Sequence, residues 1–171
     1  MYLKASRQHP AARARQQRGD TMIEVLVTII IIAVGVLGAA ALQVTTLKNL
    51  SSSHSASTAA IIAEDFSERM RANPTAALAG DYIHNAAVTV YPDCAADSCN
   101  PAQMASYDIG TWWIQLQAVL PAGTAEVTQI AGTTTFQLTV RWDDDRSGST
   151  GTNCPTQSTA DLECYQFNVT I

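Results

Sequence analysis

Basic side chains are scarce in this 171-residue chain after its first 19 residues, and acidic side chains are missing before that point. Residues 1–19 hold five basic and no acidic residues, whereas residues 20–171 hold five basic and fifteen acidic residues, a net charge of −10. Nucleic-acid binding needs clustered Lys and Arg to replace the counterions of the phosphates. The acidic body therefore argues against a nucleic-acid partner.

Sequence motifs for catalysis or cofactor binding are also missing. The chain has no G-x-S-x-G, no phosphate-binding loop and no H-E-x-x-H. Its three histidines, His9, His54 and His84, lie far apart and lack the spacing of metal ligands. The sequence therefore predicts neither an enzyme nor a bound cofactor or metal.

Charge is absent from residues 25–42, an 18-residue run. As a helix with a rise of 1.5 Å per residue, this run is about 27 Å long, close to the roughly 30 Å hydrocarbon core of a bilayer. The basic segment before it predicts that the N-terminus stays in the cytoplasm and that the rest of the chain is exported. Glu24 stands at the edge of the run, where a carboxylate loses free energy unless it finds a partner charge.

The chain has four cysteines and no C-x-x-C pair. Cys94 and Cys99 enclose four residues, and Cys154 and Cys164 enclose nine, so neither pair has the spacing of a zinc knuckle. An oxidising periplasm favours disulfides there. Pairing 94 with 99 and 154 with 164 is the simplest of three connectivities, and a zinc site is the alternative.

Neither Pro nor Gly interrupts residues 42–72. A helix that begins in the apolar run is therefore expected to continue to Asn73, which Pro74 pushes out of the helical region. Residues spaced by three and four predict a buried stripe on its second half: Ala59, Ile62, Ala63, Phe66 and Met70. The result is one helix of about 50 residues, with residues 20–42 suited to a membrane and residues 43–73 amphipathic.

Residues 74–171 are expected to form a head that covers this stripe. Residues 74–110 predict a long loop with at most a short strand near residues 87–91. A short helix is expected over residues 111–120, with Thr111 as its cap and Trp112, Leu116 and either Val119 or Leu120 on its packed face. Alternating segments predict antiparallel strands over residues 125–130, 133–142 and 164–171. The expected fold class is α+β, a long N-terminal α-helix packed on a small C-terminal antiparallel β-sheet.

A polar loop follows the second expected strand. Asp143, Asp145, Ser147 and Gly148 fit positions one, three, five and six of a calcium loop, but position twelve is Cys154 instead of a bidentate Glu. A solvated loop between strands explains the same residues, and we favour that interpretation. The tryptophans, Trp112, Trp113 and Trp142, are expected to pack in the core.

The stretch RGDTMIEVLVTIIIIAVGVLGAAALQ, residues 18–43, resembles the class III signal of type IV pilins. That signal has a basic leader ending in Gly, then a stretch ending in Glu and an apolar helix. Three further stretches, AVGVLGAAALQ, ERMRANP and CYQFNVTI, are similar to minor pilins of the PilV family. The resemblance implies a type IV pilin-like fold.

The resemblance also implies roles for individual residues. A prepilin peptidase is expected to cut between Gly19 and Asp20 and to methylate the new amine of Asp20. Glu24 then becomes the fifth residue of the mature chain, where the family places its Glu. In a fibre of packed apolar helices, the N-terminal amine of an adjacent subunit can pair with that carboxylate. The family has an aromatic residue after the cut, and Asp20 departs from this by adding a second negative charge on the face of Glu24.

The implied surroundings are those of a pilus subunit. The chain is expected in the bacterial inner membrane with a single span and a periplasmic head, and after processing in a pilus on the cell surface. Implied partners are other minor and major pilins, the prepilin peptidase and the inner-membrane assembly platform, with a tip adhesin as a further candidate. The implied role is structural, in priming pilus assembly and in pilus-dependent twitching motility and adhesion.

Two alternatives stay open. A minor pseudopilin of a type II secretion system has nearly the same signal. A membrane-anchored or secreted periplasmic binding module would need no cleavage at all, or cleavage by an ordinary signal peptidase at Ala39-Ala40-Ala41. Whether residues 1–19 are removed separates this second alternative from the pilin. The second alternative leaves Glu24 unexplained.

Overall fold

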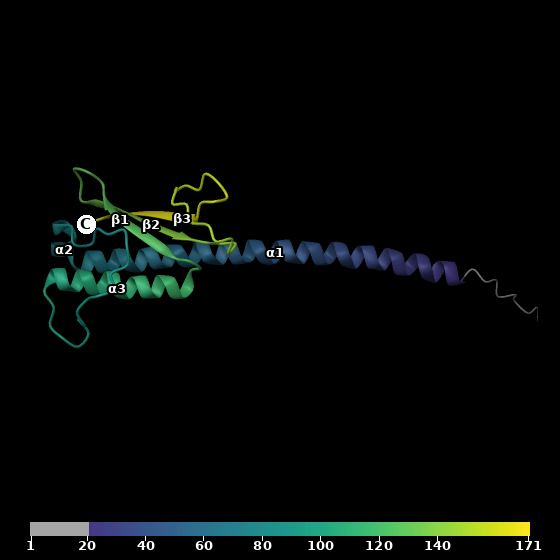
Figure 1. Cartoon of the computed structure of the whole chain (residues 1–171), viewed down its shortest axis with the longest axis horizontal. Helices are drawn as coiled ribbons and strands as arrows, with labels where there is room; N and C mark the ends of the chain where they lie inside the picture. The colour runs from purple at the N-terminus through teal and green to yellow at the C-terminus, as the bar shows by residue number, and fades with distance from the viewer. Residues whose placement is uncertain (1–20) are drawn as a thin grey trace, which may run out of the picture. The chain divides into compact units, whose positions relative to one another are not determined.

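The structure, a computed structural model, describes residues 21–171; the expected leader, which ends at Gly19, and Asp20 lie outside the described residues. Along the chain the elements are α1 (Thr21–Ala72), α2 (Pro74–Ala79), α3 (Pro101–Val119), β1 (Thr124–Gln129), β2 (Thr135–Trp142) and β3 (Glu163–Thr170) (Figure 1). The chain divides within α1 into two compact units, one up to Thr45 and the other from Thr46 to Ile171. The expected α+β class is confirmed, and each unit is described by itself.

The single long helix predicted from the sequence is confirmed. α1 has 52 residues and ends at Ala72, one residue before Asn73. Pro74 does not end helical structure altogether, because it occupies the first turn of the six-residue helix α2, where its missing N–H costs nothing. α2 ends at Gly80, whose φ of 88° is a left-handed conformation that favours glycine. The prediction of a loop from residue 74 is therefore wrong for residues 74–79.

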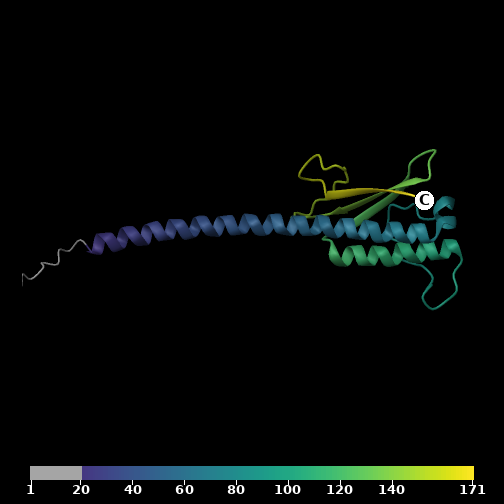
Figure 2. The same ribbon diagram turned by 180° about the vertical axis from the view of Figure 1, so that it is seen from behind.

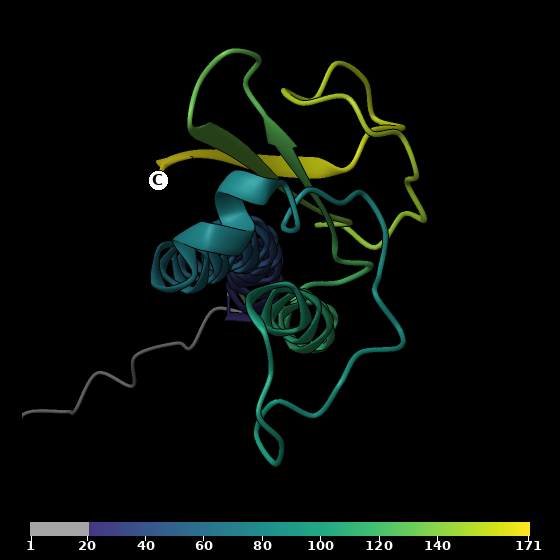
Figure 3. The same cartoon turned by 90° about the vertical axis from the view of Figure 1, so that its left-hand side faces the viewer.

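The stripe predicted on the second half of α1 is confirmed as the core of the head. All five of its residues are buried. Phe66 stacks on Trp112 of α3 with ring centroids 4.1 Å apart, and the Trp112 indole N–H donates to the backbone oxygen of Ile62 at 2.9 Å. Figure 3, an end-on view, shows α3 beside α1 with the sheet above them. One aromatic residue thus joins the two helices by both stacking and a hydrogen bond.

The predicted antiparallel sheet is also confirmed, with its three strands in the order β1-β2-β3. The strand ends lie within two residues of the predicted ones. On β2 the alternation holds, since Phe136, Leu138 and Val140 are fully buried. Figure 2 shows the sheet along one side of the second half of α1 and α3 along another. The second half of α1 is therefore covered by a helix and a sheet.

The prediction of a short helix capped by Thr111 is wrong about its start. α3 begins at Pro101, and Asn100 is its cap: the Asn100 side chain accepts from the Gln103 N–H at 2.9 Å, and the Gln103 side chain accepts from the Asn100 N–H at 3.0 Å. This reciprocal capping box begins the helix early despite Gly110 in its middle. Leu120 is buried at its other end, whereas Val119 is exposed.

The short strand expected near residues 87–91 does not form. This segment has no regular secondary structure and pairs with no strand of the described chain. The Tyr91 ring takes the place where a side chain at residue 110 would lie, because a Cβ on Gly110 would stand 2.1 Å from two carbon atoms of that ring. Packing against α3 therefore replaces strand pairing for this segment.

Candidate assembly site

Glu24 lies in the first turn of α1. An acid at this end of a helix is favourable because the unpaired N–H groups of the first turn carry partial positive charge. Within residues 21–171, Glu24 forms no ion pair with another side chain. Its carboxylate is thus placed at the helix end with no cation of the described chain beside it.

The residues that follow Glu24 are exposed over a long stretch of α1. Every residue from Met22 to Leu50 is exposed, and thirteen large apolar side chains lie between Met22 and Leu42. Thr28, the polar residue of this run, donates its hydroxyl to the Val25 backbone oxygen at 2.8 Å. A helix that is apolar on all sides belongs in lipid or among other apolar helices. Among the described residues, α1 is the one helix that is long and apolar enough to cross a membrane.

A buried polar network, which the sequence did not predict, holds the other end of α1. The Tyr82 hydroxyl donates to an Asp108 carboxylate oxygen at 2.6 Å. The Asn73 amide donates to the backbone oxygen of Pro101 at 2.8 Å and to the Tyr82 hydroxyl at 3.3 Å. An Arg69 guanidinium nitrogen lies 3.9 Å from the other Asp108 oxygen. The network ties the end of α1 to α3 and to the segment after α2.

Burial controls the protonation of this network. Desolvation raises the pKa of the Asp108 carboxyl, while the hydrogen bond from Tyr82 and the charge of Arg69 oppose that rise. Desolvation, together with the bond to Asp108, raises the pKa of Tyr82. Such pairs occur at catalytic sites as well as in structural networks. Here Tyr82 is fully buried, so the arrangement serves to hold the helices together.

His84 lies in an aromatic cluster beside this network. Its Nδ1 lies 2.9 Å from the backbone oxygen of Tyr82, so Nδ1 carries the proton and Nε2 is a bare acceptor. Nε2 is buried and has no partner within residues 21–171. Three rings surround His84 with centroids 5.8–6.1 Å away: Phe66, Trp112 and Trp113. Desolvation lowers the pKa of His84 against the raising effect of the Tyr82 carbonyl.

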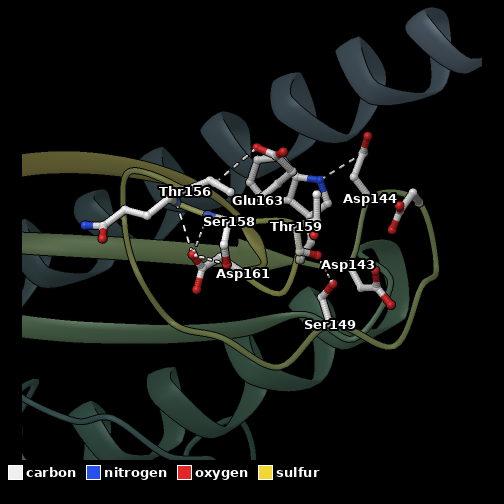
Figure 4. Close-up of a pocket in the computed structure, with 11 residues that line it drawn as sticks. Asp143, Asp144, Ser149, Thr156, Ser158, Thr159, Asp161 and Glu163 are labelled. Atoms are coloured by element: carbon white, nitrogen blue, oxygen red, sulfur yellow. Dashed lines mark hydrogen bonds between the residues drawn. The ribbon is translucent and has the colours of Figure 1, made fainter.

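The polar loop between β2 and β3 closes on its own carboxylates around a cavity of about 440 Å³ (Figure 4). Asp143 accepts from the backbone N–H groups of Ser147 and Gly148 at 3.1 and 2.9 Å, and Asp161 accepts from that of Ser158 at 2.9 Å. Backbone N–H groups thus donate to oxygens of both carboxylates. No group of three acidic, His or Cys side chains in the described chain is arranged to hold a metal ion.

The four cysteines form two disulfides, Cys94–Cys99 and Cys154–Cys164. The first closes a small loop directly before Asn100, the cap of α3. The second joins the polar loop to the start of β3, where Cys164 pairs with Arg141 of β2. The first disulfide therefore holds the residues before α3, and the second holds the start of β3.

Comparison with known families gives two adjoining matches. Residues 14–40 match the prokaryotic N-terminal methylation motif, and residues 41–110 match the Tt1218-like family, described as type IV pilin Tt1218. Together the two matches make residues 14–110 of this chain similar to type IV pilins. The first match contains Gly19, Asp20 and Glu24, and the second covers the buried half of α1, α2 and the beginning of α3. No curated protein and no solved structure matches this chain.

The candidate site residues thus fall in different parts of the chain. Glu24 lies on a bare helix end, and the cysteines lie in the head. Sequence reasoning missed Asn73, Tyr82 and Asp108, since single polar residues at loop and helix positions carry no periodic signal. It also missed Asn100, whose signal was readable, because Asn-Pro-x-Gln is a capping-box pattern.

Proposed function

We propose that this pilin is a minor type IV pilin of the PilV kind, a structural subunit that takes part in priming pilus assembly. One observation carries the proposal: α1 leaves its first half bare, with Glu24 in its first turn, while its second half is the core of a folded head. In a subunit built this way, the head folds by itself, and the first half of α1 is available to pack against neighbouring subunits. No part of the proposed role requires catalysis by this chain.

In this proposal, cleavage of the leader creates the N-terminal amine that is needed for assembly. Residues 1–19 are a cytoplasmic leader, removed by a prepilin peptidase between Gly19 and Asp20, and the new amine of Asp20 is methylated. The match of residues 14–40 to the methylation motif supports this step. Residues 20–42 anchor the chain and then pack in the fibre, and residues 43–73 and 74–171 make the head.

Glu24 acts as the assembly carboxylate. A charge buried among apolar helices costs several kcal/mol unless it is paired. The amine released by cleavage in one subunit supplies that pair for Glu24 of its neighbour, so only processed chains dock in register. Asp20 brings a second carboxylate near the same amine, which suits a subunit of low copy number or one at a pilus tip.

The proposed location follows from the same parts. The basic leader keeps the N-terminus in the cytoplasm and the head in the periplasm of the bacterial inner membrane. After processing the pilin joins other minor and major pilins through the assembly platform and reaches the cell surface. A tip adhesin is a further candidate partner, and loss of the pilin is expected to impair twitching motility and adhesion.

The deciding experiment is the N-terminal residue and mass of the chain isolated from its own membranes. A start at Asp20, with an added methyl group of about 14 Da, is expected. A start near Gln43 would make the chain a secreted domain, and an intact Met1 would make it a plain anchor; both contradict the proposal. If the chain starts at Asp20 but its loss stops secretion and spares pili, it is a minor pseudopilin of a type II secretion system.

A further inference from the structure

A segment without regular secondary structure leads from the edge of the sheet at β1 to α3. It begins with an isolated antiparallel bridge, in which the His84 N–H donates to the Val127 oxygen at 3.2 Å and the Val127 N–H donates to the His84 oxygen at 2.8 Å. Residues 85–91 then make no backbone hydrogen bond within the described chain. Residues 84–91 are called the strap below.

The strap is attached mainly at its two ends. At the end next to α3, the Tyr91 ring lies in the place that a side chain on Gly110 would take. Between the ends, Val88 is partly buried against the core, whereas Val90 is 88% exposed. Within residues 21–171, the bridge at His84 is therefore the one backbone attachment of the strap to the sheet.

The His84 ring lies among three aromatic rings of α1 and α3, those of Phe66, Trp112 and Trp113. Its Nδ1–H is used by the Tyr82 carbonyl, at 2.9 Å. Its Nε2 and the indole Nε1 of Trp113 are the two buried side-chain polar atoms of the described chain that have no hydrogen-bond partner. A buried polar atom without a partner costs free energy, and an open strap would give both atoms access to water.

The elements around the ring offer no carboxylate to a protonated His84. α1 and α3 present uncharged aromatic rings to it. β1 presents the backbone of Val127, whereas the neighbouring Glu126 points to the other face of the sheet and pairs with Arg141 at 2.9 Å. The strap itself contains no acidic residue.

Asp108 is linked to His84 through Tyr82, whose hydroxyl donates to Asp108 at 2.6 Å and whose carbonyl faces the His84 ring. The other Asp108 oxygen lies 3.9 Å from Arg69. Within the described residues, His84 forms an ion pair neither with Asp108 nor with another acid. A proton on Nε2 would therefore create a buried cation with an unpaired N–H, which is unfavourable, and burial accordingly lowers the pKa of His84.

We propose that His84 is an acid-sensitive latch, which holds the strap on β1 and α3 while its ring is neutral and releases the strap when Nε2 binds a proton. Protonation favours the open strap because water accepts the new N–H and the closed strap does not. Release exposes the edge of β1 at Val127. It also exposes Trp113, which lies three residues after Gly110 on the same side of α3. The inference concerns the head alone and does not depend on the proposed function.

Hydrogen exchange of the full-length chain in detergent micelles tests the latch. The reporters are the amides of His84 and Val127, which form the bridge, and the reference is the Leu138 amide of the central strand β2. Each rate is divided by that of an unstructured peptide at the same pH, which removes the intrinsic effect of pH on exchange. The bridge amides should exchange faster than Leu138 and with little dependence on urea, because opening of the strap exposes less surface than unfolding.

A change from about pH 7.5 to about pH 5 tests the role of the histidine. Each pH unit below the ordinary pKa of about 6.5 favours the protonated, open strap, so the protection of the bridge amides should fall about tenfold. His84→Asn keeps a donor for the Tyr82 carbonyl but binds no proton, so its bridge amides should show no such fall. His54→Asn, at an exposed position of α1, is the matched control and should behave as the wild type does.

Nitrogen NMR signals of the wild-type His84 ring make the test independent of whether the variant folds. They should report a neutral ring with a protonated Nδ1 in the closed strap and an imidazolium in the open one. A ring that is protonated at about pH 5 while the bridge amides stay protected would show that the aromatic rings hold the cation, and would overturn the latch. Bridge amides with the exchange rate and urea dependence of Leu138 would also overturn it, because the strap would then open only when the head unfolds.

Discussion

The two halves of α1 are one continuous helix, but they are built for different partners. From Met22 to Leu50 every residue is exposed, and the apolar ones lie on all sides. From Ala59 to Met70 the buried residues recur at spacings of three and four, with charged residues between them. The second half is covered by α3 and the sheet, whereas the first half is exposed within the described residues.

This difference separates residues that stabilise the folded head from residues that remain available for contacts outside it. Burial of a large apolar side chain is worth roughly 1.5–3 kcal/mol, and within the described residues only the second half gains this. In the proposed function, the first half gains it from lipid and then from neighbouring helices. Changes in the two halves should therefore separate assembly from head stability, and the following predictions test that separation.

The largest expected effect on assembly comes from a substitution of Glu24, in the first turn of α1. Under the proposed function, Glu24→Gln removes the charge that would pair with a neighbour's amine, and we expect incorporation into pili to fall by about 100-fold or more, since an unpaired buried charge costs about 3 kcal/mol. Processing at Asp20 and the unfolding temperature of the head should not change. Quantitative detection of the pilin in sheared pili and in membranes measures this, with Glu64→Gln, an exposed acid on the second half of α1, as the control. Normal incorporation of the Gln variant would remove the charge-pairing argument.

A substitution in the buried half of α1 is expected to affect the stability of the head. Phe66→Ala deletes a fully buried ring that stacks on Trp112, and we expect the free energy of unfolding of the head to fall by about 3–5 kcal/mol. Ile61→Ala, on the exposed side of the same helix, should change it by less than about 0.5 kcal/mol. Denaturant unfolding followed by tryptophan fluorescence checks both. Equal effects of the two substitutions would show that the stripe is not what stabilises the head.

The sequence predicted what periodicity and charge can encode. It gave the long helix, the five-residue stripe and the three strands, because each depends on a repeat of apolar residues at spacings of 3.6 or 2. It failed for residues 74–110, where Asn100 and Pro101 begin a helix through capping and where Gly110 makes room for Tyr91. Tyr82 and Asp108 meet only after folding, since 26 residues separate them. The position of β3 at an edge of the sheet depends on strand order, which no local pattern specifies.

Intermediate effects are expected from the disulfides, which act in the head alone. Replacing both Cys154 and Cys164 by Ser should destabilise the head by about 2–3 kcal/mol, because the closed loop no longer restricts the unfolded chain. Hydrogen exchange should accelerate first in β3, which loses its tie to the polar loop. The Cys94→Ser, Cys99→Ser variant is the matched control, and its faster exchange should lie at the first turn of α3. Faster exchange in the same amides for both variants would contradict this division.

The smallest effect concerns pH and again affects only the head. Burial holds the pKa of His84 below its ordinary value of 6.5, so the folded head binds fewer protons there than the unfolded chain. The resulting stability is present above about pH 6.5 and is lost as the pH falls through the folded pKa.

Asp108 acts in the opposite direction. Its pKa is raised, so its contribution to the stability of the head is present at low pH and is lost as the pH rises through its folded pKa. A substitution at residue 84 is therefore needed to measure the contribution of the histidine alone. His84→Asn keeps a donor for the Tyr82 carbonyl. In this variant the unfolding free energy should change less between about pH 7.5 and pH 5 than in the wild type. His54→Asn, at an exposed position of α1, should leave it unchanged. If both variants keep the wild-type slope, the buried ring does not titrate, and the pH response of the head arises elsewhere.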